Sequence, residues 1–397
     1  MRDPILSPEP LSAERPIVMR PATPPALRVA ALPDPFPMWK GGSLARAQIA
    51  YECWGELNAE RSNAILLFTG LSPTAHAASS AGNRDPGWWE NMIGPGRAID
   101  TEHYFVMCVN SLGSCFGSTG PASTNPANGK SYRLEFPELS VEDIARAGYE
   151  AARSLGIRQL DTVMGPSLGG MVVVAFAAMV PGGTRRLVSI SGSSGALPFA
   201  IALRSVQREA IMSDPAWAAG QYPDPAHGPQ SGMRLARKLG TITYRSAEEW
   251  RLRFARNGLS VTGRKAVAES TKRFPEGFGP RFDVESYLEA QAERFVRLFD
   301  ANCYLYLSRA MDNFDITAHG DPVAVLRRAQ LQSALVIGVE SDLLFTIREQ
   351  SEIATNLREA GVATVFTPLP SIEGHDAFLV DLPRFDAAVR GFLTQTH

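Results

Sequence analysis

One five-residue motif constrains the fold of this chain more than any other feature. Residues 165–169 read Gly-Pro-Ser-Leu-Gly, which fits G-x-S-x-G, between an extended apolar run over 160–164 and a helical pattern over 171–180. A serine at a sharp strand-to-helix turn projects its hydroxyl above a sheet, and the flanking glycines leave space where backbone segments approach closely. Glycines also surround serines in ordinary turns, so the motif alone does not distinguish a nucleophilic serine from a structural turn. Other residues of the chain are needed to distinguish them.

A nucleophilic serine needs a base, and the base needs a carboxylate that orients it. Asp342 follows the predicted strand 334–339, and His375 follows the predicted strand 363–367. Both therefore lie at the sheet edge that carries Ser167, in the chain order Ser, Asp, His that accompanies this motif. The alternatives are a turn or helix-capping role for Asp342 and a solvated loop position for His375.

An oxyanion that forms at the serine needs N–H donors. The Leu168 N–H comes directly after Ser167, at the positive end of a predicted helix. The second donor is expected from the loop after the predicted strand 64–69, which makes the Leu71 N–H its partner.

Strands alternate with helical patterns along most of the chain, and this predicts an α/β fold with a mainly parallel sheet covered by helices on both faces. The predicted strands are 46–54, 64–69, 103–110, 160–164, 187–191, 334–339 and 363–367. Over 192–330 the alternation stops and helical patterns prevail, which predicts a helical lid insertion. Residues 1–32 are rich in proline and charge and are predicted to be a flexible tail, which leaves 33–191 and 331–397 as the core.

Composition argues against several classes of function. The 39 Lys and Arg residues nearly balance the 41 Asp and Glu residues without long runs of one sign, so neither nucleic acid nor a charged membrane surface is an expected partner. No apolar segment is long enough to span a membrane, and no signal peptide is recognisable. Four scattered cysteines without C-x-x-C spacing argue against a zinc site and fit a reducing cytoplasm. We expect a cytoplasmic protein that acts on small molecules without a metal.

Several longer strings resemble one known family. They are GLSPTAH at 70–76, NSLGSC at 110–115, SGS at 191–193, ALPF at 196–199, RSVQREAI at 204–211, ARKLGTITYRS at 236–246 and NCYLYLSR at 302–309. With these strings the chain resembles the homoserine O-acyltransferase family of α/β-hydrolase-fold enzymes from about residue 33 to 393, and it is most similar to the members that succinylate L-serine. The resemblance implies a homodimer built through the helical insertion, with an acyl-CoA as co-substrate and no cofactor.

The resemblance also implies a ping-pong reaction. Ser167 would take the acyl group from acyl-CoA, and His375 would then deprotonate the acceptor hydroxyl that attacks the acyl-enzyme. Arg237 would bind the carboxylate of the acceptor amino acid, and Asp376 would pair with its ammonium group. Without the resemblance, Arg237 would be interpreted as an exposed arginine on a helix.

The acceptor is predicted from the loop Gly70, Leu71, Ser72 and Pro73. The homoserine enzymes tend to carry Leu-Thr-Gly where this chain has Leu-Ser-Pro at 71–73. A proline should stiffen the loop and narrow the pocket, which favours serine over homoserine. A single methylene provides only about 1–3 kcal/mol of discrimination.

Two residues give opposite indications about the acyl donor. Arg204 stands where the acetyl-using enzymes tend to have Asn, and a guanidinium suits the free carboxylate of a succinyl group. Leu344 stands where the succinyl-using homoserine enzymes have Arg, which favours acetyl. We expect succinyl-CoA, while an exposed or structural Arg204 is the alternative.

Four functions therefore stay open at this stage. The first is conversion of succinyl-CoA and L-serine to O-succinyl-L-serine and CoA, a reaction of cysteine biosynthesis. The second is homoserine acetylation or succinylation for methionine biosynthesis, and the third is hydrolysis of an ester or thioester by the same triad. The fourth is a catalytically silent binding module.

Overall fold

The computed structural model describes residues 26–267 and 273–395, and its centre is one eight-stranded sheet. The strands follow the order β1-β4-β8-β5-β9-β10-β11-β12, in which all neighbours from β8 onward are parallel and the pairs β1–β4 and β4–β8 are antiparallel. Their bounds are β1 (Arg28–Ala31), β4 (Gln48–Trp54), β5 (Ala64–Phe68), β8 (Phe105–Val109), β9 (Leu160–Pro166), β10 (Thr184–Ile190), β11 (Ser333–Val339) and β12 (Ala363–Leu369). The mainly parallel sheet predicted from the alternating pattern is confirmed.

Both faces of the sheet are covered, and alternate residues of each central strand enter two different hydrophobic clusters. One face packs against α1 (Val141–Ser154), α2 (Leu168–Met179), α10 (Pro322–Arg328) and α11 (Ile347–Glu359). The other packs against α12 (Ala377–Val380), α13 (Leu382–Leu393) and buried side chains of the segment 77–99. That segment contains the short paired strands β6 (Ile93–Gly94) and β7 (Ile99–Asp100), and a second such pair is β2 (Phe36–Pro37) with β3 (Ser43–Leu44).

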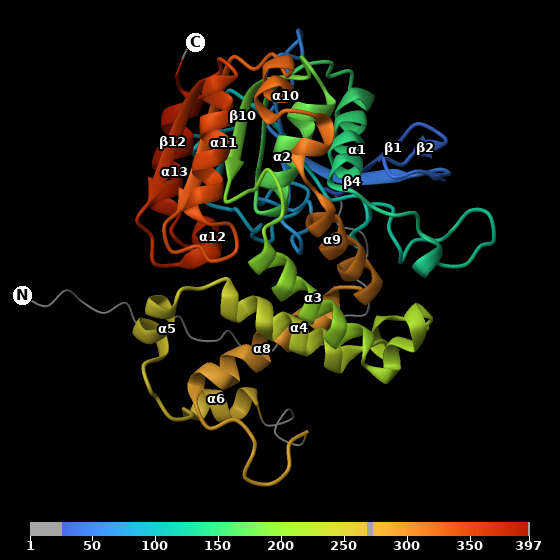
Figure 1. Cartoon of the computed structure of the whole chain (residues 1–397), viewed down its shortest axis with the longest axis vertical. Coiled ribbons are helices and arrows are strands. Elements are labelled where there is room, and N and C mark those ends of the chain that lie inside the picture. Colours follow the sequence, from blue (N-terminus) through green and yellow to red (C-terminus); the bar gives the residue numbers. More distant parts are fainter. Residues whose placement is uncertain (1–25, 268–272, 396–397) are drawn as a thin grey trace, which may run out of the picture.

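The chain between β10 and β11 is helical, as the sequence predicts, and most of it lies beside the sheet rather than on its faces (Figure 1). Its helices are α3 (Pro198–Met212), α4 (Gln230–Thr243), α5 (Ala247–Phe254), α6 (Val261–Ala266), α8 (Asp283–Leu298) and α9 (Ala301–Asn313), with the 3-10 turns η2 (Pro215–Gly220), η3 (Pro225–His227) and η4 (Ile316–His319). The helix α10 closes this segment but belongs to the core, because Val325 and Leu326 are buried in the cluster under α2. Two further 3-10 turns are η1 (Arg133–Glu135) and η5 (Gly374–Asp376).

The predicted tail 1–32 is wrong at its C-terminal end. Residues 28–31 form the edge strand β1, which pairs antiparallel with β4, while residues 1–25 lie outside the described residues. Of the four residues of β1 only Ala30 is buried. An edge strand that is held by backbone hydrogen bonds needs little apolar patterning, so the sequence of this stretch did not indicate a strand. Over the ranges that the structure describes, no helix has both the length and the apolar character that a membrane span requires.

Replacing Gly169 by alanine is expected to destabilise the fold. A Cβ at this position would lie 2.5 Å from the carbonyl oxygen of Phe68 in β5, and neither backbone segment can move without shifting the sheet. Overpacking of this kind costs about 1–3 kcal/mol. Gly391 in α13 is the control, because no atom lies within 4 Å of a Cβ built there and alanine is the better helix former by about 1 kcal/mol. Chemical denaturation of Gly169→Ala and Gly391→Ala should give changes in unfolding free energy of opposite sign, and changes of the same sign would contradict the steric argument.

Candidate active site

Ser167 occupies the turn between β9 and α2 in a strained conformation. Its φ of 58° and ψ of −121° lie where residues other than glycine are rarely found. The Ser167 N–H donates to the Ile190 carbonyl at the end of β10, 2.9 Å away. A Cβ on Gly165 would lie 2.8 Å from the Phe68 carbonyl oxygen, so the glycines on both sides of the serine permit close backbone contact. The turn has the geometry that the sequence motif predicts.

The structure brings the three predicted triad residues together. His375 Nε2 lies 2.7 Å from Ser167 Oγ, and His375 Nδ1 lies 2.7 Å from Asp342 Oδ2. An ionised Asp342 can only accept, so Nδ1–H donates to it and Nε2 is left to accept the proton of the serine hydroxyl. His375 and Asp342 are each only 3% exposed. The arrangement can therefore activate Ser167 for nucleophilic attack.

Two backbone N–H groups fix the orientation of Asp342. Its Oδ1 accepts from Leu344 N at 2.8 Å and from Phe345 N at 3.0 Å, just beyond the end of β11. These bonds leave Oδ2 directed at the histidine. The Leu344 side chain is buried in the core, so the structure shows it as a packing residue next to the triad.

Aromatic rings surround the imidazole of His375. Phe345 stacks on it with ring centroids 5.0 Å apart, and Phe378 and Tyr244 approach with centroids at 5.9 Å. Burial lowers the pKa of His375, but the charge of Asp342 and the hydrogen bond to it outweigh burial and raise the pKa above its ordinary value of about 6.5. The ring must be neutral to act as a base, so activity should fall as the pH drops through this raised pKa.

The segments that carry the two predicted oxyanion donors both lie beside Ser167. Leu168 is the first residue of α2, and an N–H at that position has no partner within its own helix. A Cβ on Gly70 would lie 3.8 Å from the Ser167 Cβ and 3.7 Å from Pro73 Cδ, so the loop that carries Leu71 passes directly beside the serine. Donation from Leu71 and Leu168 to an oxyanion remains a prediction, as does the effect of the loop on the choice of acceptor.

Arg237 is half-buried on α4, which contradicts its interpretation as an exposed arginine. Its guanidinium carbon lies 4.7 Å from the ring centre of Phe295 and 5.7 Å from that of Tyr244. Its Nε is buried without a hydrogen-bond partner among the described residues. The ring of Tyr244 also lies 5.9 Å from that of His375, centroid to centroid, so Tyr244 contacts both Arg237 and the triad.

Asp376 follows the catalytic histidine and is anchored to the helical insertion. Its N–H donates to the Tyr244 carbonyl at 3.1 Å, and its Oδ2 lies 3.3 Å from Arg245 Nε. Arg245 also donates to Glu373 at 2.7 Å. Sequence reasoning missed Tyr244 and Arg245, although both belong to the distinctive string 236–246, which was the signal that pointed to them.

Arg204 on α3 is only 7% exposed, which excludes a surface position for it. Its Nε donates to Asp312 Oδ1 at 2.5 Å, and its Nη2 is buried without a hydrogen-bond partner among the described residues. Its positive charge acts on His375 by lowering the pKa of that residue, against the larger effect of Asp342. Arg204 is therefore within electrostatic reach of the triad, and sequence reasoning missed its partner Asp312.

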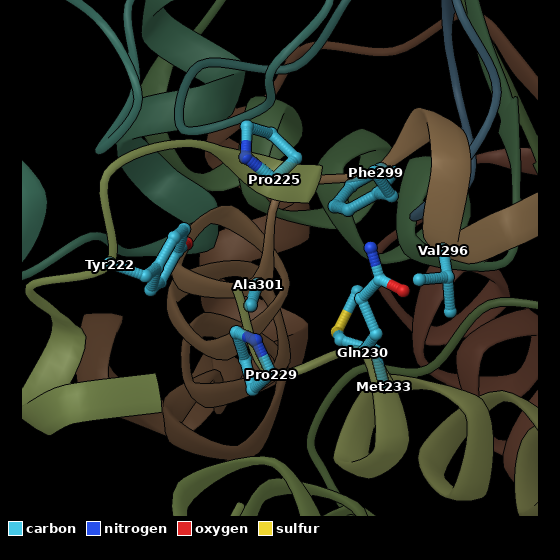
Figure 2. Close-up of a pocket in the computed structure, with 8 residues that line it drawn as sticks. All are labelled: Tyr222, Pro225, Pro229, Gln230, Met233, Val296, Phe299 and Ala301. Atoms are coloured by element: carbon cyan, nitrogen blue, oxygen red, sulfur yellow. The ribbon is translucent and has the colours of Figure 1, made fainter. Parts of the chain in front are cut away.

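Figure 2 shows a separate pocket at the junction of α4, α8 and α9. Its cavity volume of about 10 Å³ is the space of about one water molecule. It is lined by Tyr222, Pro225, Pro229, Gln230, Met233, Val296, Phe299 and Ala301. None of these is a predicted site residue, so this pocket is no candidate for substrate binding. Within the described ranges, no group of three or more His, Cys, Asp and Glu side chains could hold a metal ion.

A Ser-His-Asp triad at the carboxyl edge of a mainly parallel sheet defines an enzyme of the α/β-hydrolase fold. The family model described as alpha/beta hydrolase fold matches residues 63–381, and the chain belongs to that family. Within it the protein is an acyltransferase of the homoserine O-acyltransferase family. The serine O-succinyltransferase of Stenotrophomonas maltophilia (strain K279a) is 56% identical over 372 residues, which cover 93% of this chain and 98% of the relative.

Solved structures agree on the fold. A homoserine O-acetyltransferase from Bacillus anthracis superposes with a TM-score of 0.82 at 28% identity, over 93% of this chain and 98% of the other. Esterase E22 superposes with a TM-score of 0.79 at 26% identity, over 92% and 99% of the two chains. The same architecture is thus shared with an enzyme named for acyl transfer and with one named for ester hydrolysis, so the residues around the triad have to distinguish the two.

Replacing Asp342 by asparagine should shift the pH dependence of the reaction. Asp342 raises the pKa of His375 and burial lowers it, so without the carboxylate the acidic limb of kcat/KM should move to lower pH. The rate should also fall by about 10⁴-fold, as in serine proteases that lose this carboxylate, because the histidine loses its tautomer and orientation. The measurement is kcat/KM for CoA release between pH 5 and 9, as about two units on each side of neutrality cover the relevant range.

The control for this experiment is Asp386→Asn, which removes a carboxylate that pairs with Arg390 on the distant helix α13. Its pH profile should coincide with that of the wild type. An acidic limb that stays in place in Asp342→Asn would show that His375 does not titrate under the control of Asp342.

Proposed function

We propose that the enzyme transfers the succinyl group of succinyl-CoA to the hydroxyl of L-serine, which yields O-succinyl-L-serine and CoA. The observation that carries the proposal is the combination of an assembled triad with the buried guanidinium of Arg204, which has an unpartnered Nη2 within electrostatic reach of His375. A positive charge in that place suits an acyl donor that ends in a carboxylate. The name serine O-succinyltransferase of the relative from Stenotrophomonas maltophilia supports the same reaction.

The first half-reaction forms an acyl-enzyme. His375 Nε2 takes the proton of the Ser167 hydroxyl while Oγ attacks the thioester carbon, and the negative charge of the tetrahedral oxygen is stabilised by the N–H groups of Leu71 and Leu168. The C–S bond then breaks, the imidazolium gives its proton to the CoA sulfur, and the succinyl group remains on Ser167. The distance of 2.7 Å between Nε2 and Oγ supports this proton transfer.

In the second half-reaction the acceptor is the nucleophile and Ser167 is the leaving group. His375 takes the proton of the acceptor hydroxyl, the acceptor oxygen attacks the acyl-enzyme, and Ser167 leaves with the proton from the imidazolium. The acceptor is a zwitterion, so it needs one group of each charge. Arg237 binds its carboxylate and Asp376 its ammonium group, and the ion pair of Asp376 with Arg245 orients that carboxylate.

Transfer to an amino acid rather than to water requires a site that excludes water. Tyr244 comes from the insertion and places its ring 5.9 Å from that of His375, and its carbonyl oxygen would lie 2.7 Å from a Cβ on Gly374. This close packing of the insertion against the loop that carries His375 supports transfer over hydrolysis. Homoserine acylation is the second candidate, favoured by the likeness to the Bacillus anthracis enzyme, and the loop 70–73 is proposed to select serine.

The insertion also presents large apolar side chains to solvent, and these support the proposal of a homodimer formed through it. Those on α3, α4 and α5 include Phe199, Val206, Met212, Leu235, Ile242 and Leu252. A surface of this kind on a single chain is typical of a protein interface. A location in the cytoplasm is proposed together with the biosynthetic role.

An assay of every donor with every acceptor condition tests the reaction. Purified protein is mixed with succinyl-CoA or acetyl-CoA and with L-serine, L-homoserine or no acceptor, while free CoA thiol is followed. Thiol release should be fastest with succinyl-CoA and L-serine, and without acceptor it should stop after about one equivalent of acyl-enzyme, as ping-pong transfer requires. Mass spectrometry should then detect one succinyl group on the wild type and none on Ser167→Ala. Release at the full rate without an acceptor would identify a hydrolase instead.

Replacing Arg204 by leucine should change the choice of donor. Without the guanidinium a succinyl carboxylate has no hydrogen-bond partner of opposite charge, an interaction of about 1.5–3 kcal/mol that corresponds to about 10- to 100-fold in kcat/KM. Acetyl-CoA lacks this carboxylate and should lose much less. Steady-state kinetics with both donors measure the effect, and equal losses for the two would remove Arg204 from the donor site.

A further inference from the structure

A second buried arginine lies one helical turn after Arg204 on α3. Arg208 is 5% exposed, and its Nη1 lies 2.6 Å from Asp312 Oδ2, while Arg204 Nε lies 2.5 Å from the other oxygen of the same carboxylate. The Asp312 side chain is 4% exposed and comes from α9, which packs against α3 next to the sheet (Figure 1). Two guanidiniums thus share one carboxylate in the interior of the protein.

The charges of this cluster do not balance. Like charges four residues apart on a helix repel each other, and burying an ion costs several kcal/mol unless it is paired. Asp312 can neutralise only one of the two arginines. Arg208 also donates to Ser308 Oγ at 2.8 Å, which is a neutral partner, and among the described residues no second carboxylate pairs with either arginine. The cluster therefore has an excess of one positive charge.

The excess charge lies within electrostatic reach of the triad. Burial raises the pKa of Tyr304, and the positive charges of Arg237, Arg204 and Arg208 each act to lower it. All three arginines are therefore within electrostatic reach of one buried ring. Arg204 also acts on His375, which places this cluster on the side of the triad that the insertion covers.

A second trio of two arginines and one aspartate in the same protein shows what a purely structural cluster looks like. Asp161 pairs with Arg185 and Arg186 at the opposite end of the sheet. Arg185 is partly solvated, with 31% of its side chain exposed, and Arg186 uses its remaining N–H groups on the Leu393 carbonyl and the Tyr104 hydroxyl. The arginines of that trio therefore need no ligand, because solvent and groups of the protein itself satisfy them. The trio around Asp312 is not satisfied in this way, because Arg204 Nη2 has no hydrogen-bond partner among the described residues, and Arg208 meets Asp312 Oδ2 as an ion pair without a hydrogen bond.

We propose that Arg208 and Asp312 are positioning residues of a carboxylate-binding subsite, in which Arg208 neutralises Asp312 so that Arg204 retains a free positive charge for the distal carboxylate of the acyl donor. Asp312 holds the Arg204 guanidinium through Nε, and the ligand carboxylate would take the unpartnered Nη2. This inference rests on the proposed function, since it explains how a succinyl donor is bound. It assigns donor selection to a charge balance of three residues instead of to Arg204 alone.

The variant Arg208→Gln tests the charge balance. It keeps a polar side chain of similar length but leaves Asp312 to neutralise Arg204, so the ratio of kcat/KM for succinyl-CoA over acetyl-CoA should fall by about 10-fold or more. The loss should lie mainly in the KM for succinyl-CoA. Arg208→Lys keeps the charge and should retain most of the ratio, which gives a second measurement should the glutamine variant fold poorly.

The double variant Arg208→Gln/Asp312→Asn restores the excess charge on Arg204 and should return the ratio to within about threefold of the wild type, since the charge-assisted hydrogen bond to the donor is available again. The matched control is Arg186→Gln, which breaks the structural trio and should lower stability without changing the ratio. Equal losses for both donors in Arg208→Gln, or a double variant that stays as poor as the single one, would overturn the charge-balance role.

The wild-type kinetics separate this inference from the proposed function. A wild-type enzyme that does not prefer succinyl-CoA contradicts the proposed donor and the subsite together. A wild-type enzyme that prefers succinyl-CoA, with a ratio unchanged in Arg208→Gln, contradicts only the role of Arg208 and leaves the proposed donor in place.

Discussion

The close approach of two backbone segments below Ser167 is the constraint on which the rest of the structure depends. Gly169 at the start of α2 packs on the Phe68 carbonyl at the end of β5, where a single added carbon would lie 2.5 Å from oxygen. This contact holds the serine at a positive φ, and it places the loop after β5 beside the serine. One steric condition therefore positions the nucleophile and both predicted oxyanion donors.

The position of Ser167 also determines where the charged residues of the triad have to lie. With Ser167 at the carboxyl edge of the sheet, the loops after β11 and β12 bring Asp342 and His375 to the same edge. Aromatic rings then enclose the imidazole, and the buried carboxylate raises the pKa of His375 in spite of that enclosure. The imidazole is thus a base of raised pKa that is almost completely buried, and burial of the base favours transfer to an acceptor over reaction with water.

The sequence predicted the parts of the protein that depend on local patterns. The alternation of strands and helices predicted the mainly parallel sheet. The order of Ser167, Asp342 and His375 placed three residues from distant parts of the chain at one edge before any geometry was known. This worked because in a parallel sheet every strand ends at the same side.

What escaped prediction were pairings between residues far apart in sequence that have no periodic signature. Arg204 and Asp312 are 108 residues apart, and nothing in the pattern around Asp312 distinguishes it from a solvated aspartate on a helix. The edge strand β1 was missed because it buries a single alanine and is held by its backbone. Arg237 was expected on the surface from its type alone, and only the rings packed beneath its guanidinium explain why it is half-buried.

The arginines of the insertion support the proposal that the site binds two carboxylates, one from the acceptor and one from the donor. Asp376 is paired with Arg245, and Asp312 with Arg204 and Arg208, whereas Arg237 has no acidic partner among the described residues. Two positive charges are thus left over, one beside the expected place of the acceptor and one beside that of the donor. In the proposed reaction, an acetyl group would leave the second charge buried and uncompensated, which costs free energy, while a succinyl group would neutralise it. Serine and homoserine carry the same charges, so electrostatics cannot discriminate between them, and the proposed selection of serine would depend on the space that the loop 70–73 leaves for the acceptor.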